Sequence, residues 1–367
     1  MEDVMALADT RYSNRRRALS ARLAGQRIDM MLVTNLIHVQ YLSGFSGSNA
    51  ALMLSKDLNP QIATDGRYTT QVAEEVPDIE ALIERSCATA LLSRLEGPRR
   101  VGVEADHLSL AQWEGLQKAA GEDVTLVPVR GVVEELRLVK DSQELESLRS
   151  VAALASQAFE DLLAAGELAV GRSERDIAAD LEYRMRKAGS ERTSFDTIVA
   201  SGVNSAKPHH GAGDRVLREG DLVTVDFGAH VGGFNSDMTR TVVMGKADEF
   251  SAEIYEVVKR AQAAGVEAST VGTALADVDR ATREIIEEAG YGEYYVHSTG
   301  HGVGLEVHEG PAAASGAEGV LREGMTLTIE PGIYVPGRGG VRIEDTLIIT
   351  PGAPEVITQV SKDLMVL

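Results

Sequence analysis

The chain has 367 residues, of which 44% are hydrophobic and 25% are charged. This composition can bury a sizeable core and argues against intrinsic disorder, and the length suits two domains. The 36 Lys and Arg residues against 56 Asp and Glu residues give a formal net charge of −20. A nucleic acid is therefore not expected as a partner, because its phosphates would be repelled.

Cysteine usage and hydropathy bear on the compartment. Cys87 is the only cysteine, so the chain cannot form an intramolecular disulfide and suits a reducing compartment. The acidic start, residues 1–4, lacks the basic and apolar regions of a signal peptide. No run approaches the roughly 18 apolar residues that a membrane-spanning helix needs. We therefore expect a cytoplasmic protein that does not interact with a membrane.

Helix and strand patterns alternate in the first part of the chain. Helices are expected over residues 11–25 and 108–120, and strands over residues 30–33, 50–54, 60–64, 102–104 and 124–128. This alternation predicts an α/β domain with a mixed or parallel sheet.

The charge distribution indicates where this domain ends. Residues 1–140 hold 16 basic and 19 acidic residues, whereas residues 141–367 hold 20 and 37. A long helical pattern also begins near this change. We therefore expect an N-terminal domain over residues 1–133 and a second domain over residues 134–367.

The second part repeats one order of elements, two helices followed by paired strands. Helices are expected over residues 143–165, 173–189, 251–269 and 273–289, and strands over residues 222–228, 237–244, 325–330 and 341–349. Ser173 is expected to cap the second helix, because its hydroxyl can accept from a free backbone N–H of the first turn.

The repeat is also visible in the residues. REGDLVTVDFG at 218–228 matches REGMTLTIEPG at 322–332, which sets Asp226 opposite Glu330. Asp237 and Glu344 follow on similar strands. An internal duplication with pseudo-twofold symmetry explains this pattern economically, and chance similarity is the alternative.

Each half of the duplication therefore brings two carboxylates to a hairpin. Asp226 and Asp237 flank a turn near residues 230–233, and Glu330 and Glu344 flank one near residues 336–340. Cross-strand neighbours of this kind lie close together. Four buried anions would repel one another strongly unless divalent cations neutralised them. The alternative, that all four are solvated hairpin charges, fits poorly with the apolar residues that flank them.

Five of the eight histidines lie within residues 209–308 in glycine-rich or paired settings. They are His209, His210, His297, His301 and His308. A lone histidine is more often a hydrogen-bonded structural residue. A cluster beside four acidic residues instead favours metal binding or catalysis.

These motifs resemble those of the pita-bread-fold metallopeptidases, which include aminopeptidase P, prolidase, methionine aminopeptidase and creatinase. The matching segments are PHHGAGD (208–214), VDFGA (225–229), SDMTRT (236–241), HSTGHGVGLEVHE (297–309), TIEPGIY (328–334) and VRIED (341–345). The first part is similar to the creatinase/prolidase-type N-terminal domain through YLSGFSGSN (41–49) and TDGRY (64–68). The resemblance implies an α/β N-terminal domain and an α+β pita-bread catalytic domain, with the carboxylates on the inner face of a curved antiparallel sheet.

The resemblance also implies a dinuclear metal site. Its five ligands would be Asp226, Asp237, His301, Glu330 and Glu344. Asp237 and Glu344 would bridge two divalent ions, Asp226 would complete one of them, and His301 and Glu330 the other. Manganese is the first expectation, with cobalt or zinc as alternatives.

Further roles follow from the same resemblance. Glu330 would carry protons between the attacking water and the leaving nitrogen, while His209 and His308 would bind the substrate and the developing oxyanion. His297 would line the substrate pocket. Arg342 and Tyr334 would assist there, Arg342 by orienting carboxylates. His210 is expected to be a neighbour rather than a participant.

The expected activity is hydrolysis of the bond between an N-terminal residue and a following proline. The N-terminal domain disfavours a methionine aminopeptidase, and the complete ligand set disfavours a non-catalytic peptide-binding module. A Xaa-Pro aminopeptidase is the first expectation and a Xaa-Pro dipeptidase the alternative. Family resemblance also implies a homodimer.

Overall fold

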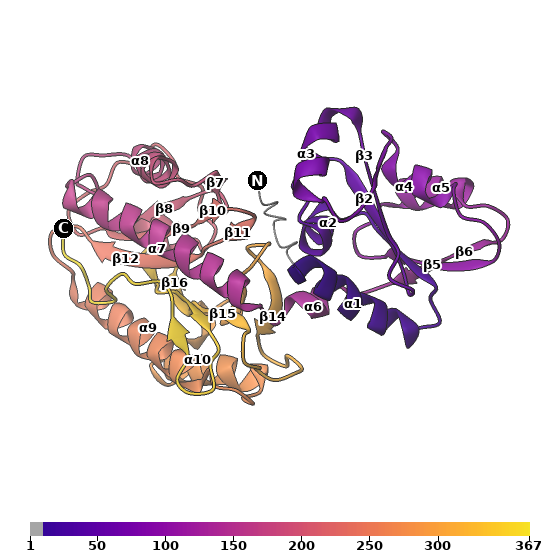
Figure 1. Ribbon diagram of the computed structural model, residues 1–367. Coiled ribbons are helices and arrows are strands. Elements are labelled where there is room, and N and C mark those ends of the chain that lie inside the picture. The colour runs from indigo at the N-terminus through magenta and orange to yellow at the C-terminus, as the bar shows by residue number, and fades with distance from the viewer. Residues whose placement is uncertain (1–9) are drawn as a thin grey trace, which may run out of the picture. The chain divides into compact units, whose positions relative to one another are not determined.

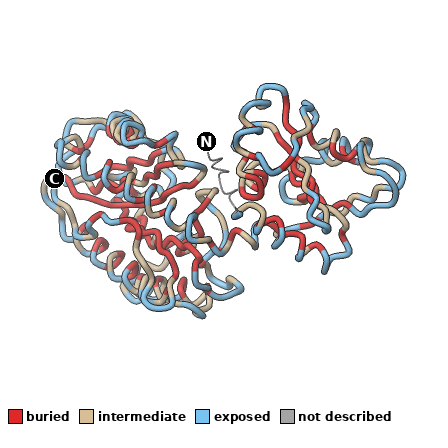
Figure 2. The backbone as a smooth tube through the Cα atoms, in the orientation of Figure 1, coloured by how far each residue is buried: buried red, intermediate tan, exposed pale blue. Residues whose placement is uncertain are grey.

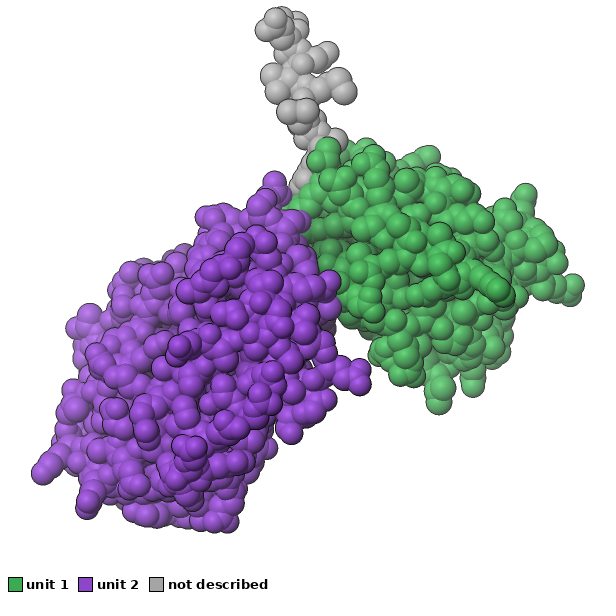
Figure 3. Space-filling model, turned by 90° about the horizontal axis from the view of Figure 1, so that it is seen from below, with its two compact units in different colours: residues 1–136 green, residues 137–367 purple. Residues whose placement is uncertain are grey.

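The computed structural model describes residues 10–367 (Figure 1). It divides into two compact units, residues 1–136 and 137–367, which Figure 3 colours separately. This division lies close to the expected boundary after residue 133. The acidic residues 1–4, where no signal peptide is expected, lie outside the described range. Within that range no helix is long and apolar enough to span a bilayer.

The first unit contains a six-stranded mixed sheet with strand order β4-β3-β2-β1-β5-β6. Its strands are β1 (Met30–Val33), β2 (Ala50–Ser55), β3 (Pro60–Thr64), β4 (Ala81–Ile83), β5 (Arg99–Glu104) and β6 (Val124–Val129). Its helices are α1 (Thr10–Ala24), α2 (Leu36–Ser43), η1 (Gly66–Tyr68), α3 (Thr69–Glu75), α4 (Cys87–Leu92) and α5 (Leu110–Ala119), and α6 (Glu134–Arg137) lies at the division.

The structure confirms the α/β class and the mixed sheet of this unit. Strands β1 and β5 are parallel, whereas β1 and β2 are antiparallel. The sequence analysis missed the short elements α2, α3, α4 and β4. For α2 a local signal was present, since the Asn35 side chain caps its start and Gly44, at φ 87°, ends it.

The second unit combines four long helices with short antiparallel strands. The helices are α7 (Ser142–Ala164), α8 (Glu174–Lys187), α9 (Glu249–Ala268) and α10 (Leu275–Glu288), with the short η2 (Gly202–Ala206) and η3 (Gly292–Tyr294). The strands are β7 (Arg192–Thr193), β8 (Ile198–Ser201), β9 (Leu222–Phe227), β10 (Ala229–Val231), β11 (Phe234–Asn235), β12 (Met238–Val243), β13 (Gly300–Gly302), β14 (Glu309–Ala313), β15 (Thr326–Ile329), β16 (Gly332–Val335), β17 (Gly339–Arg342), β18 (Asp345–Ile348) and β19 (Glu355–Val356).

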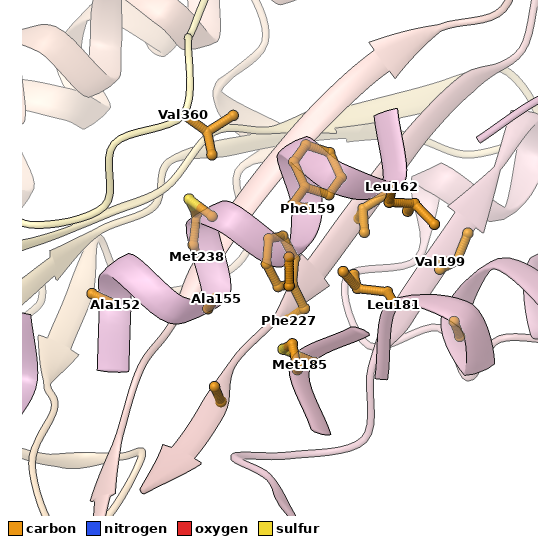
Figure 4. Packing of buried hydrophobic residues seen from close by; sticks show 14 of the residues in the cluster. Ala152, Ala155, Phe159, Leu162, Leu181, Met185, Val199, Phe227, Met238 and Val360 are labelled. Atoms are coloured by element: carbon orange, nitrogen blue, oxygen red, sulfur yellow. The ribbon is translucent and has the colours of Figure 1, made fainter. Parts of the chain in front are cut away.

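The helices of this unit pack over the outside of its buried strands, which form the continuous red centre of Figure 2. Phe159 of α7 stacks on Phe227 of β9 with ring centroids 5.1 Å apart (Figure 4). Phe227 directly follows Asp226 in the chain. Burial of this apolar face therefore helps to fix the direction of the neighbouring carboxylate on the opposite face of β9.

The strands of this unit pair in several small antiparallel groups. In particular, the expected strand over residues 341–349 is interrupted between β17 and β18. The cause is local. The backbone N–H of Glu344 donates to the carbonyl of Thr239, 3.1 Å away in the other repeat. Glu344 is therefore not part of the strand pairing in its own repeat, and its backbone N–H links the two repeats.

Threonine side chains complete this junction between the repeats. The hydroxyl of Thr241 donates to the Arg342 carbonyl at 2.9 Å and accepts from the Arg342 N–H at 3.2 Å. The hydroxyl of Thr346 donates to the Asp237 carbonyl at 2.8 Å. These bonds take the place of a regular ladder and hold the carboxylate-bearing strands in one register.

Candidate metal centre

The predicted site residues gather around one cavity of about 450 Å³ in the second unit. Its lining residues are Phe195, Asp196, Ile198, Pro208, His209, His210, Gly211, Asp226, Asp237, His297, Ser298, His301, His308, Glu330, Arg342 and Glu344. All five expected ligands are among them. Of the residues given a role in the sequence analysis, only Tyr334 is not part of the lining.

The two hairpins deliver their carboxylates with different geometry. In the first repeat Asp226 pairs with Thr239, so Asp237 is its diagonal rather than its direct neighbour. In the second repeat Ile329 pairs with Asp345, and the same register continued by one residue sets Glu330 opposite Glu344. Diagonal and direct neighbours both lie within reach of a shared ion.

Asp226 has one oxygen bound and one oxygen free. Its Oδ2 accepts from Arg342 Nη2 at 2.6 Å, whereas its Oδ1 is buried without a hydrogen-bond partner among residues 10–367. A buried carboxylate oxygen is costly unless it is paired. Oδ1 is therefore suited to bind a metal ion, which would supply the missing partner. Burial raises the pKa of Asp226 despite the opposing charge of Arg342.

Asp237 and Glu344 are almost inaccessible, at 4% and 2% exposure. Burial, followed by repulsion from Glu344 and Asp226, raises the pKa of Asp237 well above its ordinary value. Burial, followed by repulsion from Glu330 and Asp226, does the same to Glu344. The Thr239 hydroxyl, at 2.7 Å from Glu344 Oε2, orients this carboxylate. Such crowding requires either protons or cations.

His301 and Glu330 form the other side of the cluster. His301 Nε2 lies 3.3 Å from Glu330 Oε1 and 3.6 Å from Asp237 Oδ2. The other nitrogen, Nδ1, lies 3.1 Å from the Gly302 carbonyl and can donate to it, which leaves Nε2 available as a ligand. Burial alone would raise the pKa of Glu330, but His301 lowers it below its ordinary value.

These residues fit a pair of divalent ions. Three overlapping groups, each with ligand atoms within 4.8 Å of one another, are Asp226–Asp237–Glu344, His301–Glu330–Glu344 and Asp237–His301–His308. Asp237, His301 and Glu344 each belong to two of the groups, so the three groups form one connected set of ligand atoms. Carboxylate oxygens together with imidazole nitrogens suit manganese, cobalt or zinc, and Asp226 Oδ1 is free of hydrogen bonds to the described residues.

His209 and His308 are the more exposed histidines of the cavity, and His308 lies against the cluster with its ring centroid 4.3 Å from that of His301. Both are exposed and line the cavity. Partial burial of the ring and the nearby His301 lower the pKa of His308, which favours the neutral imidazole; this form still has one N–H to donate. Their position leaves both rings accessible to a ligand in the cavity.

His297, Tyr334 and Arg342 form a hydrogen-bonded chain behind the cluster. Arg342 Nη1 donates to the Tyr334 hydroxyl at 2.9 Å, and that hydroxyl lies 2.8 Å from His297 Nε2. His297 Nδ1 lies 2.8 Å from the Ser298 carbonyl. Burial lowers the pKa of His297, which agrees with a neutral ring whose two nitrogens are both engaged. This chain orients Arg342 and through it Asp226.

His210 and the segment around Phe195 complete the description of the cavity. His210 Nε2 lies 2.8 Å from Glu174 Oε2, so its ring is bound to the protein. Phe195, Asp196 and Ile198 also line the cavity, and the sequence analysis did not identify them. No metal or glycine motif marks them. They could be found only through the pairing of β8 with β9, which sets Ile198 opposite Asp226.

The fold and the cavity together are those of a two-domain metallopeptidase. The chain belongs to metallopeptidase family M24, whose model matches residues 146–351. The creatinase/prolidase N-terminal domain matches residues 15–139. The resemblance found in the sequence is thereby confirmed, as is its implied combination of an α/β N-terminal domain with a pita-bread catalytic domain.

Individual relatives cover nearly the whole chain. The chain is 37% identical over 345 residues to the Xaa-Pro dipeptidase of Pyrococcus furiosus, which covers 92% of this chain and 95% of the relative. The structure is similar to a Xaa-Pro dipeptidase from Bacillus anthracis, with a TM-score of 0.92, 38% identity and coverage of 97% and 100%. It is also similar to the X-Pro aminopeptidase from Thermotoga maritima, with a TM-score of 0.87, 33% identity and coverage of 96% and 99%.

The protein is thus a metallo-exopeptidase of a family that uses divalent metal ions. The comparisons do not favour the aminopeptidase that the sequence analysis put first. Several relatives are Xaa-Pro dipeptidases, so the alternative fits them better. The motifs of the sequence analysis did not make this distinction.

Metal binding to the chelator-treated protein near neutral pH is expected to release protons. Asp237 and Glu344 have raised pKa values, so without metal they hold protons to a higher pH than ordinary carboxyls do. Metal binds only the deprotonated groups. Release should therefore be larger, and affinity weaker, at about pH 6 than at about pH 8.

Binding calorimetry in two buffers of different ionisation enthalpy measures this release. Asp196→Asn is the matched control, because Asp196 lines the cavity outside the expected ligand set and should leave the release unchanged. A binding heat that is independent of the buffer would contradict the crowded-carboxylate description.

Proposed function

We propose that the protein is a Xaa-Pro dipeptidase that uses two divalent ions. The observation that carries this proposal is the gathering of four carboxylates and His301 around one cavity, with ligand atoms within 4.8 Å in each of three overlapping groups. A cavity of about 450 Å³ suits a small peptide. The preference for a dipeptide is supported by the relatives that are Xaa-Pro dipeptidases.

Bound divalent ions would activate a water molecule, polarise the scissile carbonyl and stabilise charge in the transition state. We assign their binding to Asp226, Asp237, His301, Glu330 and Glu344. Asp237, His301 and Glu344 each belong to two ligand groups. Of these three, Asp237 and Glu344 are carboxylates with two oxygens each, which supports bridging roles for these two.

Glu330 is the proposed proton carrier. Its lowered pKa keeps it an anion at neutral pH, so it can accept a proton from the attacking water. The leaving nitrogen of a Xaa-Pro bond carries no hydrogen of its own and must gain a proton when the bond breaks. Thr328 Oγ1, 3.2 Å from Glu330 Oε1, steadies the carboxylate for this transfer.

His209 and His308 are the proposed substrate-binding residues. Both rings are exposed at the cavity, and an N–H from either can bind a carbonyl or carboxylate oxygen of the substrate. We give His297 and Arg342 a supporting role at the pocket wall, with Tyr334 behind them, because His297 and Tyr334 are engaged with their neighbours.

Manganese is the proposed native ion, with cobalt or zinc as alternatives. The homodimer and the cytoplasmic location stay predictions. A Xaa-Pro aminopeptidase is the second candidate function, supported by the similarity to the Thermotoga maritima enzyme.

Substrate length separates the two candidates. The enzyme loaded with Mn²⁺ is expected to cleave a Xaa-Pro dipeptide in preference to the matching Xaa-Pro-Yaa tripeptide, and an excess of chelator should abolish both activities. Product analysis by chromatography measures the two rates. Preferential cleavage of the tripeptide would identify an aminopeptidase instead. If both activities persisted in an excess of chelator, the metal mechanism would be refuted.

Glu330→Gln should lower kcat by about 100-fold or more, because a glutamine cannot accept and return the proton. Steady-state kinetics on the dipeptide measures the loss, and metal analysis of the same sample separates lost proton transfer from lost metal. Glu323→Gln is the control, since Glu323 is an exposed glutamate of the same repeat. Near-normal turnover of Glu330→Gln would remove Glu330 from this role.

A further inference from the structure

A buried glutamate outside the cavity holds the loop that carries His209. Glu174, in the first turn of α8, has 0% exposure and is not part of the cavity lining. A carboxylate so deeply buried is stable only if its oxygens are well hydrogen-bonded or paired with a cation. Its partners therefore indicate what it does.

The two oxygens of this carboxylate bind opposite sides of one loop. Oε1 accepts from the backbone N–H and the hydroxyl of Ser201, at 2.8 and 2.7 Å, and from Asn204 Nδ2 at 3.0 Å. Oε2 accepts from His210 Nε2 at 2.8 Å and from the Gly213 N–H at 3.2 Å. His209 lies between these two groups of donors, so a single side chain closes the base of its loop.

These bonds require a charged acceptor. Burial alone would raise the pKa of Glu174, but hydrogen bonds from Ser201, Asn204 and His210 lower it below its ordinary value. An ionised carboxylate offers only acceptors, which matches five donors. A glutamine at position 174 would replace one of the two acceptor oxygens by an NH₂ donor. That group would face the N–H or O–H donors on one side of the loop and could not accept from them.

The second repeat uses a similar arrangement. Asp279 of α10 accepts from the backbone N–H and the hydroxyl of Thr299, at 3.1 and 2.9 Å. Thr299 lies between His297 and His301 in the chain. In each repeat, therefore, a buried carboxylate from the second helix binds one hydroxyl-bearing residue next to a segment that carries site histidines.

We propose that Glu174 is a positioning residue that sets His209 for substrate binding, an inference that rests on the proposed role of His209. The ring of His209 has no hydrogen bond to any other described residue, and residues 207–213 form no helix or strand. The place of this ring therefore depends on the backbone anchors on either side of it. A displacement of about 1 Å in such a group can lower activity by about 100-fold.

A double-mutant cycle with His209 tests this inference. Glu174→Gln should lower kcat/KM for a Xaa-Pro dipeptide by about 10- to 100-fold. In a His209→Ala background the same change should alter kcat/KM by no more than about twofold, because the group that it positions is already absent. Metal content should stay unchanged in every variant.

Asp176→Asn is the matched control. Asp176 lies in the same helical turn but is exposed, and it contacts the cap residue Ser173 rather than the loop. The Asp176→Asn variant should therefore keep the wild-type kcat/KM. If Glu174→Gln does not fold, His210→Ala replaces it in the cycle. This variant removes the anchor nearest to His209 and leaves the buried Glu174 carboxylate unchanged.

The outcomes are distinct. Equal losses in both backgrounds, or full activity of Glu174→Gln, would overturn the positioning role while leaving the proposed function intact. A wild-type chain without metal-dependent cleavage would refute the proposed function and this inference with it.

Discussion

Repulsion among four clustered carboxylates, two of them buried and two partly buried, is the constraint on which the rest of the catalytic unit depends. Asp226, Asp237, Glu330 and Glu344 surround one cavity, and the raised pKa values of Asp237 and Glu344 express the cost of holding them there. In a medium of low dielectric constant, like charges at such separations repel by several kcal/mol. Two divalent ions would reverse the sign of this interaction and make the cluster stable.

The internal repeat is what makes the cluster geometrically feasible. Each half contributes two carboxylates, and the hydroxyls of Thr241 and Thr346 join the halves through backbone groups. Behind Glu344, the fully buried Arg240 binds Asp345 at 2.7 Å and also donates to the Glu344 carbonyl. Arg240 and Asp345 come from different repeats. The ligand set is therefore held rigid before any ion binds, as a preorganised site requires.

Further anchors extend this rigidity to the histidines around the cavity. Glu174 ties down the loop of His209, and Asp279 ties down the segment between His297 and His301. Three groups of residues around the cavity have different roles. Carboxylates of the strands hold charge, exposed histidines meet the substrate, and buried carboxylates of the helices keep the histidine-bearing segments in place.

The sequence predicted the parts of this arrangement that leave a local pattern. Helical periodicity located α7 and α8, and the match between 218–228 and 322–332 located the duplication and its carboxylates. Contacts between distant residues left no such pattern. Glu174 meets Ser201 and Gly213, 27 and 39 positions away, and nothing near it in the chain signals these contacts.

The exact course of the strands was the second feature that the sequence did not predict. The prediction of one continuous strand over residues 341–349 was wrong. The strand is interrupted where the backbone N–H of Glu344 donates to the Thr239 carbonyl in the other repeat. Periodicity describes only one chain segment at a time. The preference for an aminopeptidase had no motif of its own behind it, and the relatives fit the dipeptidase better.

The central claim is that the cluster exists to bind two divalent ions. Equilibrium dialysis of the chelator-treated chain against Mn²⁺, followed by elemental analysis, tests it most directly. The account predicts two tightly bound ions per chain at neutral pH, with cooperative thermal unfolding shifted to higher temperature by binding. A protein that binds no ion, or whose unfolding temperature is the same with and without the metal, would contradict it.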